Sequence, residues 1–206
     1  VRVNSRVTKI DPANKTVTVL NLIDNQSYEE SYDNLVISTG AKPRALPTPG
    51  IARAHVLRDV EDATGIKSLV DSGKIKSAAI LGAGFIGIEL AENFVHRGLK
   101  TTVVEMSRSI LPQFDAEIIE PFQAHLVANG IELALGVTAA SINEKTITLS
   151  DGKEIDADIV VSAAGVVPDH HLAVEAGLTI GESGGIWVDN HQRTSDEHIF
   201  AVGDAA

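Results

Sequence analysis

The feature that most constrains the fold is an apolar run that leads directly into a glycine-rich turn. Residues 77–81 read Ser-Ala-Ala-Ile-Leu, and residues 82–89 read Gly-Ala-Gly-Phe-Ile-Gly-Ile-Glu. A second apolar run, at 101–104, ends at Glu105, close to the spacing of about 20 residues from the first glycine at which an acid is expected. This order predicts a strand, a tight turn, a helix and a second strand. Together they form the fingerprint of a dinucleotide-binding α/β unit.

Each glycine of the motif has a physical reason to lack a side chain. Gly82 allows a tight turn, Gly84 allows backbone N–H groups to approach a pyrophosphate, and Gly87 allows the helix to press against the strand. Glu105 can accept hydrogen bonds from the adenine-ribose hydroxyls and would repel a 2′-phosphate, a repulsion that Arg108 could partly offset. The sequence therefore predicts an NAD(H) site and favours NADH over NADPH. The alternatives are a glycine turn without a ligand and a solvated acid at a strand end.

Composition excludes several other classes of protein. The chain has 206 residues, no cysteine and a formal net charge of −11. Without cysteine, these residues hold no disulfide, thiolate metal site or thiol nucleophile, and the seven histidines show no metal-ligand spacing. The negative charge disfavours nucleic acid and anionic lipid, and no apolar run approaches the ~18 residues of a membrane span. We therefore expect a cytoplasmic protein with no metal site, no nucleic-acid partner and no membrane segment.

Two stretches of the chain repeat one another. Val7-Thr8 and the run 15–19 recur at one constant offset as Val137-Thr138 and the run 145–149. After a loop that is five residues shorter, Asp33, Leu35, Val36, Gly40 and Pro43 recur at a second, smaller offset as Asp158, Val160, Val161, Gly165 and Pro168. Both copies predict a β-meander followed by an apolar strand that ends at a glycine. Chance similarity between two hairpins is the alternative.

The duplication predicts how the chain is organised. In the second copy the meander that begins at Val137 follows a nucleotide-binding unit that begins near Gly82. An equivalent unit at the same distance ahead of Val7 would have its glycine motif before Val1. The chain is therefore expected to begin within one nucleotide-binding domain and to contain a second in full. A proline-rich stretch at 43–49 predicts the boundary between them.

The coarse pattern of apolar residues, glycines and prolines predicts the remaining elements. Strands are expected at 3–10, 16–22, 28–32, 34–38, 78–81, 101–105, 131–135, 158–163, 186–188 and 198–202, and helices at 59–72, 84–97, 115–129 and 171–176.

Four motifs, at residues 38–43, 82–89, 164–169 and 194–204, resemble those of the FAD-dependent pyridine nucleotide-disulfide oxidoreductases, particularly the NADH oxidase, NADH peroxidase and coenzyme A-disulfide reductase branch. The resemblance implies an α/β fold with a three-layer Rossmann-like NAD(H)-binding domain that includes a β-meander. This domain would span 46–168, and a partial, discontinuous FAD-binding domain would span 1–45 and 169–206. The implied cofactors are NAD(H) and FAD, and the implied oligomer is a homodimer.

The resemblance also implies roles for individual residues. On the NAD side these are Gly82, Gly84, Phe85, Ile86, Gly87, Glu89, Glu105, Arg108 and Gly165, and on the FAD side Thr39, Gly40, Gly203 and Asp204. In the family, the residue matching Phe85 covers the flavin ring until nicotinamide displaces it, and the residue matching Glu89 lies near the carboxamide. Asp204 matches the acid that hydrogen-bonds the ribityl chain, and Gly165 matches backbone close to the nicotinamide half of NAD.

Helical spacing adds an expectation about these side chains. Phe85 and Glu89 lie four residues apart and should share one face, whereas Ile86, Leu90 and Phe94 should form the face packed on the sheet. The alternatives are a packing aromatic for Phe85 and a solvated charge for Glu89. For Asp204 the alternative is an N-cap residue.

The resemblance leaves the overall reaction open. The family's redox cysteine and first glycine motif would lie upstream and its dimerisation domain downstream, so no catalytic residue is expected within these residues. The implied function is hydride transfer from NAD(P)H to FAD and on to a small-molecule acceptor, which could be a disulfide, oxygen or peroxide. The alternatives are the flavin-NADH module of a nitrite or ferredoxin reductase and a non-catalytic NAD-binding redox sensor, against which the Gly203-Asp204 motif weighs.

Overall fold

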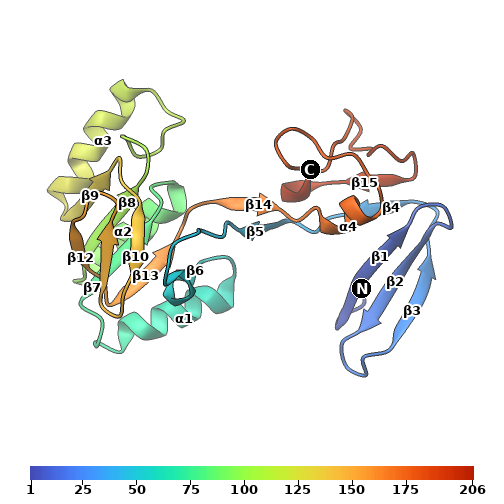
Figure 1. Cartoon of the computed structure of the whole chain (residues 1–206), viewed down its shortest axis with the longest axis horizontal. Coiled ribbons are helices and arrows are strands. Elements are labelled where there is room, and N and C mark those ends of the chain that lie inside the picture. Colours follow the sequence, from blue (N-terminus) through green and yellow to red (C-terminus); the bar gives the residue numbers. More distant parts are fainter. The chain divides into compact units, whose positions relative to one another are not determined.

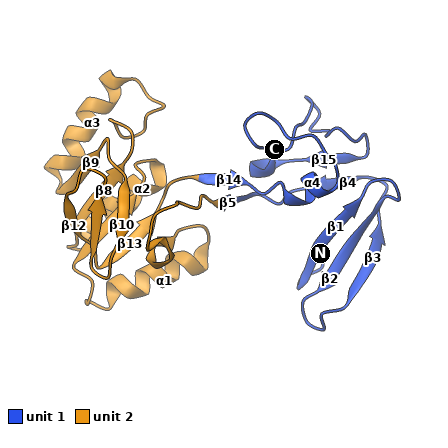
Figure 2. Ribbon diagram, viewed as in Figure 1, with its two compact units in different colours: residues 1–42, 166–206 blue, residues 43–165 orange.

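A computed structural model describes all of residues 1–206, which divide into two compact units (Figures 1 and 2). Unit 1 comprises residues 1–42 and 166–206, and unit 2 comprises residues 43–165. Each boundary lies three residues before the position that the sequence predicts. The chain thus passes twice between the units. The two strands at these crossings, β5 (Ala41–Pro43) and β14 (Val166–Pro168), pair with each other.

A five-stranded parallel sheet in the order β6-β13-β7-β8-β9 forms the centre of unit 2. Its strands are β6 (His55–Val56), β7 (Ser77–Leu81), β8 (Lys100–Glu105), β9 (Ile131–Leu135) and β13 (Ile159–Ser162). The unit also contains the short 3-10 helix η1 (Ile51–Arg53), the helices α1 (Val60–Asp71), α2 (Phe85–His96) and α3 (Ala116–Ala128), and the antiparallel meander β10 (Ala139–Ile142), β11 (Thr146–Leu149) and β12 (Glu154–Asp156). No helix of the chain combines the length and the apolar character that crossing a membrane requires.

Alternate side chains of β7 contribute to two different cores. Ala78 and Ile80 join the core that the helices form, which includes Phe94 of α2. Ala79 and Leu81 join the core that the meander forms. A parallel strand covered on both faces is apolar throughout, which explains the uninterrupted run at 77–81. Unit 2 is therefore three-layered, with helices, parallel sheet and meander, as the sequence predicts.

Unit 1 contains a second meander and a small parallel sheet (Figure 2). The meander is β1 (Ser5–Asp11), β2 (Thr16–Asn21) and β3 (Ser27–Ser31), the parallel pair is β4 (Leu35–Ile37) with β15 (Ile199–Ala201), and the helices are α4 (His171–Glu175) and the 3-10 turn η2 (Gly203–Ala205). The strand expected at 186–188 is wrong. A single bridge joins Ile186 to Ile180 across a tight turn that contains Gly184 at φ +88°.

The strand registers of the two meanders confirm the internal duplication. Thr16 of β2 pairs with Ser31, and Thr146 of β11 pairs with Asp156. The second strands of the two meanders are therefore related by the larger of the two predicted offsets, and the third strands by the smaller one. The loop that is shorter by five residues joins the second strand to the third in the second copy.

The predicted match for the first strand is wrong by two residues. Val7 pairs with Val19, and Ala139 pairs with Leu149, so the structural equivalent of Val7 is Ala139 rather than Val137. The hairpin turn is two residues shorter in the second copy, and the shared Val-Thr letters concealed this difference. In both copies the register shifts directly after the equivalent residue, which marks the same β-bulge.

Asp158 joins the start of β13 to the start of β7. Its Oδ2 accepts hydrogen bonds from the backbone N–H groups of Lys76, at 2.9 Å, and Ser77, at 3.1 Å, and from the Ser77 hydroxyl, at 3.1 Å. The N–H of Lys76 is the largest of several causes that hold the pKa of Asp158 below its ordinary value of 3.8. A depressed carboxyl pKa means that the ionised side chain stabilises the folded chain.

Replacing Asp158 with alanine should lower the free energy of unfolding at pH 7 by about 1–3 kcal/mol, because two backbone donors lose a charged acceptor. Since folding depresses this pKa, the stabilisation is present above the unfolded-state pKa and is lost as pH falls through the folded-state pKa. The difference in stability between wild type and variant should therefore shrink as pH falls below about 4. Urea unfolding at pH 7 and pH 3 measures this convergence.

The matched control for this prediction is Asp156→Ala, because the Asp156 side chain is 71% exposed. It should change stability by less than about 0.5 kcal/mol. A loss for Asp158→Ala that is equally large at both pH values would contradict the role given to the charge.

Candidate functional site

The glycine turn between β7 and α2 has two positions where no side chain fits. Gly82 has a φ of +113°, and a Cβ there would lie 2.5 Å from the carbonyl oxygen of Ala163. A Cβ at Gly87 would lie 2.0 Å from the carbonyl oxygen of Gly82. Glycine at both positions therefore allows α2 to begin directly against the end of β7, as the motif predicts.

Gly84 differs from Gly82 and Gly87, because a Cβ at Gly84 would contact no other atom. Its backbone is extended, with φ −77° and ψ −176°, and a Cβ would have no atom within 4 Å. Gly84 is the N-cap of α2, and no side chain caps this helix, whereas α1 begins with a complete capping box between Asp59 and Asp62. The start of α2 thus combines the positive end of a helix with open space, an arrangement that fits a pyrophosphate group.

Glu105, the last residue of β8, contacts this turn directly. Its Oε2 accepts a hydrogen bond from the N–H of Ala83 at 2.9 Å, and its Oε1 accepts one from the N–H of Ser107 at 2.7 Å. The structure thus brings the acid and the glycine turn together, as the spacing predicts. It also gives the acid a structural task that the sequence did not indicate. Arg108 is exposed and lies on the segment that follows.

One of the two predicted faces of α2, the face packed on the sheet, differs from the helical expectation. The residues buried against the rest of unit 2 are Gly87, Ile88, Ala91 and Phe94. Ile86 is 49% exposed, so its expected place on the sheet-facing side is wrong. The contact of Gly87 with the turn fixes the rotation of the helix and directs Ile86 outward. Phe85 and Glu89 are both exposed, which agrees with their shared face.

Phe114 is a residue of this site that sequence reasoning missed. Its ring meets that of Phe85 edge-on, with ring centroids 6.0 Å apart and an interplanar angle of 90°. Phe114 lies between β8 and α3, so a helix and a strand separate it from Phe85 along the chain. No spacing rule relates positions that far apart, and only the fold could bring them together.

In unit 1 the predicted residues Thr39 and Gly40 lie against Asp169. The Thr39 hydroxyl donates to the Asp169 carbonyl at 2.6 Å, and the N–H of Asp169 donates to the Gly40 carbonyl at 2.9 Å. The Asp169 carboxylate also forms an ion pair with Lys42 at 2.8 Å. Gly203, at φ +73°, and Asp204 lie in η2, and both are exposed. Gly165 is exposed, at φ +85°.

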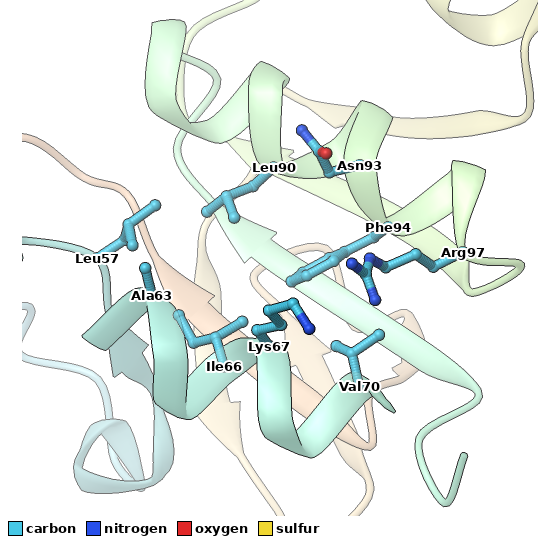
Figure 3. Close-up of a pocket in the computed structure, with 9 residues that line it drawn as sticks. All are labelled: Leu57, Ala63, Ile66, Lys67, Val70, Leu90, Asn93, Phe94 and Arg97. Carbon is cyan, nitrogen blue, oxygen red and sulfur yellow. The ribbon is translucent and has the colours of Figure 1, made fainter. Parts of the chain in front are cut away.

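A separate cavity of about 180 Å³ lies between α1 and α2 (Figure 3). Figure 3 shows Ile66 and Val70 of α1 and Leu90 and Phe94 of α2 lining it, together with two charged residues, Lys67 and Arg97. Asp71 forms ion pairs with both cations. The cavity lies along the second half of α2 rather than at its start, so it is distinct from the glycine turn.

Comparison with known proteins identifies the family. The chain belongs to the pyridine nucleotide-disulphide oxidoreductases, whose family pattern matches residues 1–206. It is 29% identical over 204 residues to a coenzyme A disulfide reductase of Staphylococcus epidermidis, covering 99% of this chain and 46% of the relative. It is 37% identical over 187 residues to an NADH oxidase of Methanocaldococcus jannaschii, covering 88% and 42%.

A solved structure supports the same conclusion. Reduced CoADR-RHD from Bacillus anthracis aligns with a TM-score of 0.93 and 38% identity, over 98% of this chain and 37% of that protein. The α/β fold with Rossmann-type nucleotide-binding units is therefore that of FAD-dependent oxidoreductases. The chain spans just under half the length of the curated relatives it matches.

Substitutions at Gly87 and at Gly84 should separate an effect on folding from an effect on ligand binding. Gly87→Ala should lower the free energy of unfolding by about 1–3 kcal/mol or more, because the added methyl group overlaps a backbone oxygen. Gly84→Ala should change stability by less than about 0.5 kcal/mol, yet weaken NADH binding, because its methyl group enters the open space beside α2. Urea unfolding and NADH fluorescence titration measure both effects. Equal losses of stability in the two variants would contradict this division.

Proposed function

We propose that the chain supplies the NAD(H)-binding domain and part of the FAD-binding domain of an NADH-dependent flavoprotein oxidoreductase. The observation that carries the proposal is the junction of the glycine turn with Glu105. The open side of Gly84, the uncapped start of α2 and a carboxylate bonded to the same turn lie together at the carboxyl ends of β7 and β8. Ligands of parallel α/β sheets bind at this end of the strands.

Within this proposal the chain acts by holding and orienting its ligands. Backbone N–H groups at the start of α2 would hold the pyrophosphate, and Glu105 would accept hydrogen bonds from the ribose hydroxyls. Arg108 lies on the segment after Glu105. Phe85, Ile86 and Glu89, exposed on the first turns of α2, and Gly165 would border the nicotinamide half. Hydride transfer would require no acid or base from these residues, because a bound flavin supplies the hydride-accepting ring.

Unit 1 would supply the flavin contacts. Thr39 and Gly40 would border FAD, and the exposed Asp204 carboxylate would accept hydrogen bonds from the ribityl hydroxyls, with Gly203 providing the turn before it. We propose a small disulfide, oxygen or peroxide as the electron acceptor, and relatives named as a coenzyme A disulfide reductase and an NADH oxidase support the first two. We further propose a cytoplasmic homodimer.

The role of Glu105 can be tested through cofactor preference. Glu105→Gln should weaken NADH binding by about 1–3 kcal/mol, because a charged acceptor for the ribose is lost. The preference over NADPH should fall, because the charge that repels a 2′-phosphate is removed. Titration of both nucleotides by fluorescence measures the ratio of dissociation constants. Thermal melts separate this effect from the lost hydrogen bonds to Ala83 and Ser107.

The control for Glu105→Gln is Glu92→Gln, which makes the same change on the exposed side of α2. It should leave both dissociation constants unchanged. If Glu105→Gln keeps the wild-type preference between NADH and NADPH, the proposed ribose contact is wrong.

The flavin part of the proposal predicts a role for Asp204 in the full-length protein. Asp204→Ala should weaken FAD binding by about 1.5–3 kcal/mol, the usual range for a hydrogen bond to a charged group. Visible absorbance after desalting measures the retained flavin, and Asp24→Ala on the exposed β2–β3 turn is the control. A wild-type protein that never retains FAD would instead favour a non-catalytic NAD-binding module.

A further inference from the structure

An aromatic pair joins the start of α2 to the segment between β8 and α3. Phe85 is the first residue of α2, and its side chain is 63% exposed, so the core does not fix its orientation. The ring of Phe114, itself 44% exposed, meets it edge-on at a centroid distance of 6.0 Å. This T-shaped arrangement is the favourable geometry for two aromatic rings.

Phe114 is held by a well-anchored segment. Ile110 and Leu111, at 0% and 5% exposure, are buried in the core of unit 2. The N–H of Ile110 donates to the Gln123 side chain of α3 at 2.9 Å, and the N–H of Phe114 donates to the Leu111 carbonyl at 3.0 Å. The backbone at Phe114 is therefore anchored, and it places the Phe114 ring beside Phe85.

The same segment is attached to the glycine turn at Ala83. The Ala83 carbonyl accepts a hydrogen bond from the N–H of Leu111 at 3.0 Å, and the Ala83 N–H donates to Glu105 at 2.9 Å. One turn residue thus connects the acid at the ribose end to the segment that carries Phe114. The backbone of the segment that carries Phe114 is consequently anchored to the turn of the proposed pyrophosphate site.

We propose that Phe114 is a positioning residue that holds Phe85 in its nucleotide-free orientation, and that the nicotinamide ring must break this contact to reach its place. The inference rests on the proposed function, because it requires the nicotinamide half to lie at the exposed start of α2. An aromatic pair of this kind changes an equilibrium constant by roughly two- to tenfold. Phe114 therefore opposes nicotinamide entry without touching the adenosine half.

The test compares NADH with ADP-ribose, which has the same adenosine and pyrophosphate but no nicotinamide. Phe114→Leu in the purified chain should tighten NADH binding by roughly two- to tenfold, since Phe85 is released from its partner. ADP-ribose binding should stay unchanged. Phe114→Tyr, which keeps the aromatic edge, should restore the wild-type ratio of the two dissociation constants. Calorimetric titration measures both ligands.

Phe200→Leu is the matched control, because it makes the same change in unit 1 and should alter neither dissociation constant. The chain has five phenylalanines, so labelling with 4-fluorophenylalanine gives a direct readout of the pair. The fluorine signal of Phe85, assigned by its loss in Phe85→Leu, should shift in Phe114→Leu and not in Phe200→Leu.

Two results would overturn the inference for different reasons. If Phe114→Leu leaves the ratio of NADH to ADP-ribose affinity unchanged, Phe114 does not control nicotinamide entry. The proposed dinucleotide site would still stand in that case. If the wild-type chain bound neither ligand, the proposed function itself would fail, and the role of Phe114 would fail with it.

Discussion

The close approach of α2 to the turn before it is the constraint on which the rest of unit 2 depends. Gly87 packs on the Gly82 carbonyl where no Cβ fits, so α2 starts directly at the end of β7. This contact fixes the rotation of the helix, buries Ile88 and Phe94, and directs Phe85 outward. It also aims the positive end of the helix at the open space beside Gly84. Core packing and the orientation of the proposed ligand site therefore rest on the same backbone contact.

The duplication accounts for the similar build of the two units. Each contains a three-stranded meander with a bulge in its first strand, then a parallel strand and a glycine of positive φ. Gly40 and Gly165 occupy equivalent places, and the strands that follow them, β5 and β14, are the two crossings between the units. Where the chain leaves a core, its backbone groups would otherwise depend on solvent for hydrogen bonds. The pairing of β5 with β14 supplies hydrogen-bond partners at this point.

Sequence reasoning succeeded where a single local rule decides the outcome. The run 77–81 had to be buried on both faces, and glycines mark the limits of α2, so these elements were predicted to within a residue. It failed where no single spacing rule decides the outcome. Ile86 is turned outward by the contact at Gly87, the equivalence of Val137 was concealed by a shorter hairpin, and Phe114 meets Phe85 only through the fold. The ligand roles of the site residues stay predictions, because they depend on partners outside the chain.

The two tasks of Glu105 are compatible because an ionised carboxylate has about four acceptor positions. Two of these are used by the N–H groups of Ala83 and Ser107, one on each oxygen, which leaves one on each oxygen for a ribose diol. The hydrogen bonds to the backbone also fix the direction in which the free positions point, so the ribose contact requires no further ordering of the side chain. An acid that holds the turn is in this way pre-organised for the sugar. A chain that replaced it to accept a 2′-phosphate would have to find another acceptor for the Ala83 N–H, and this requirement connects cofactor preference to the stability of the turn.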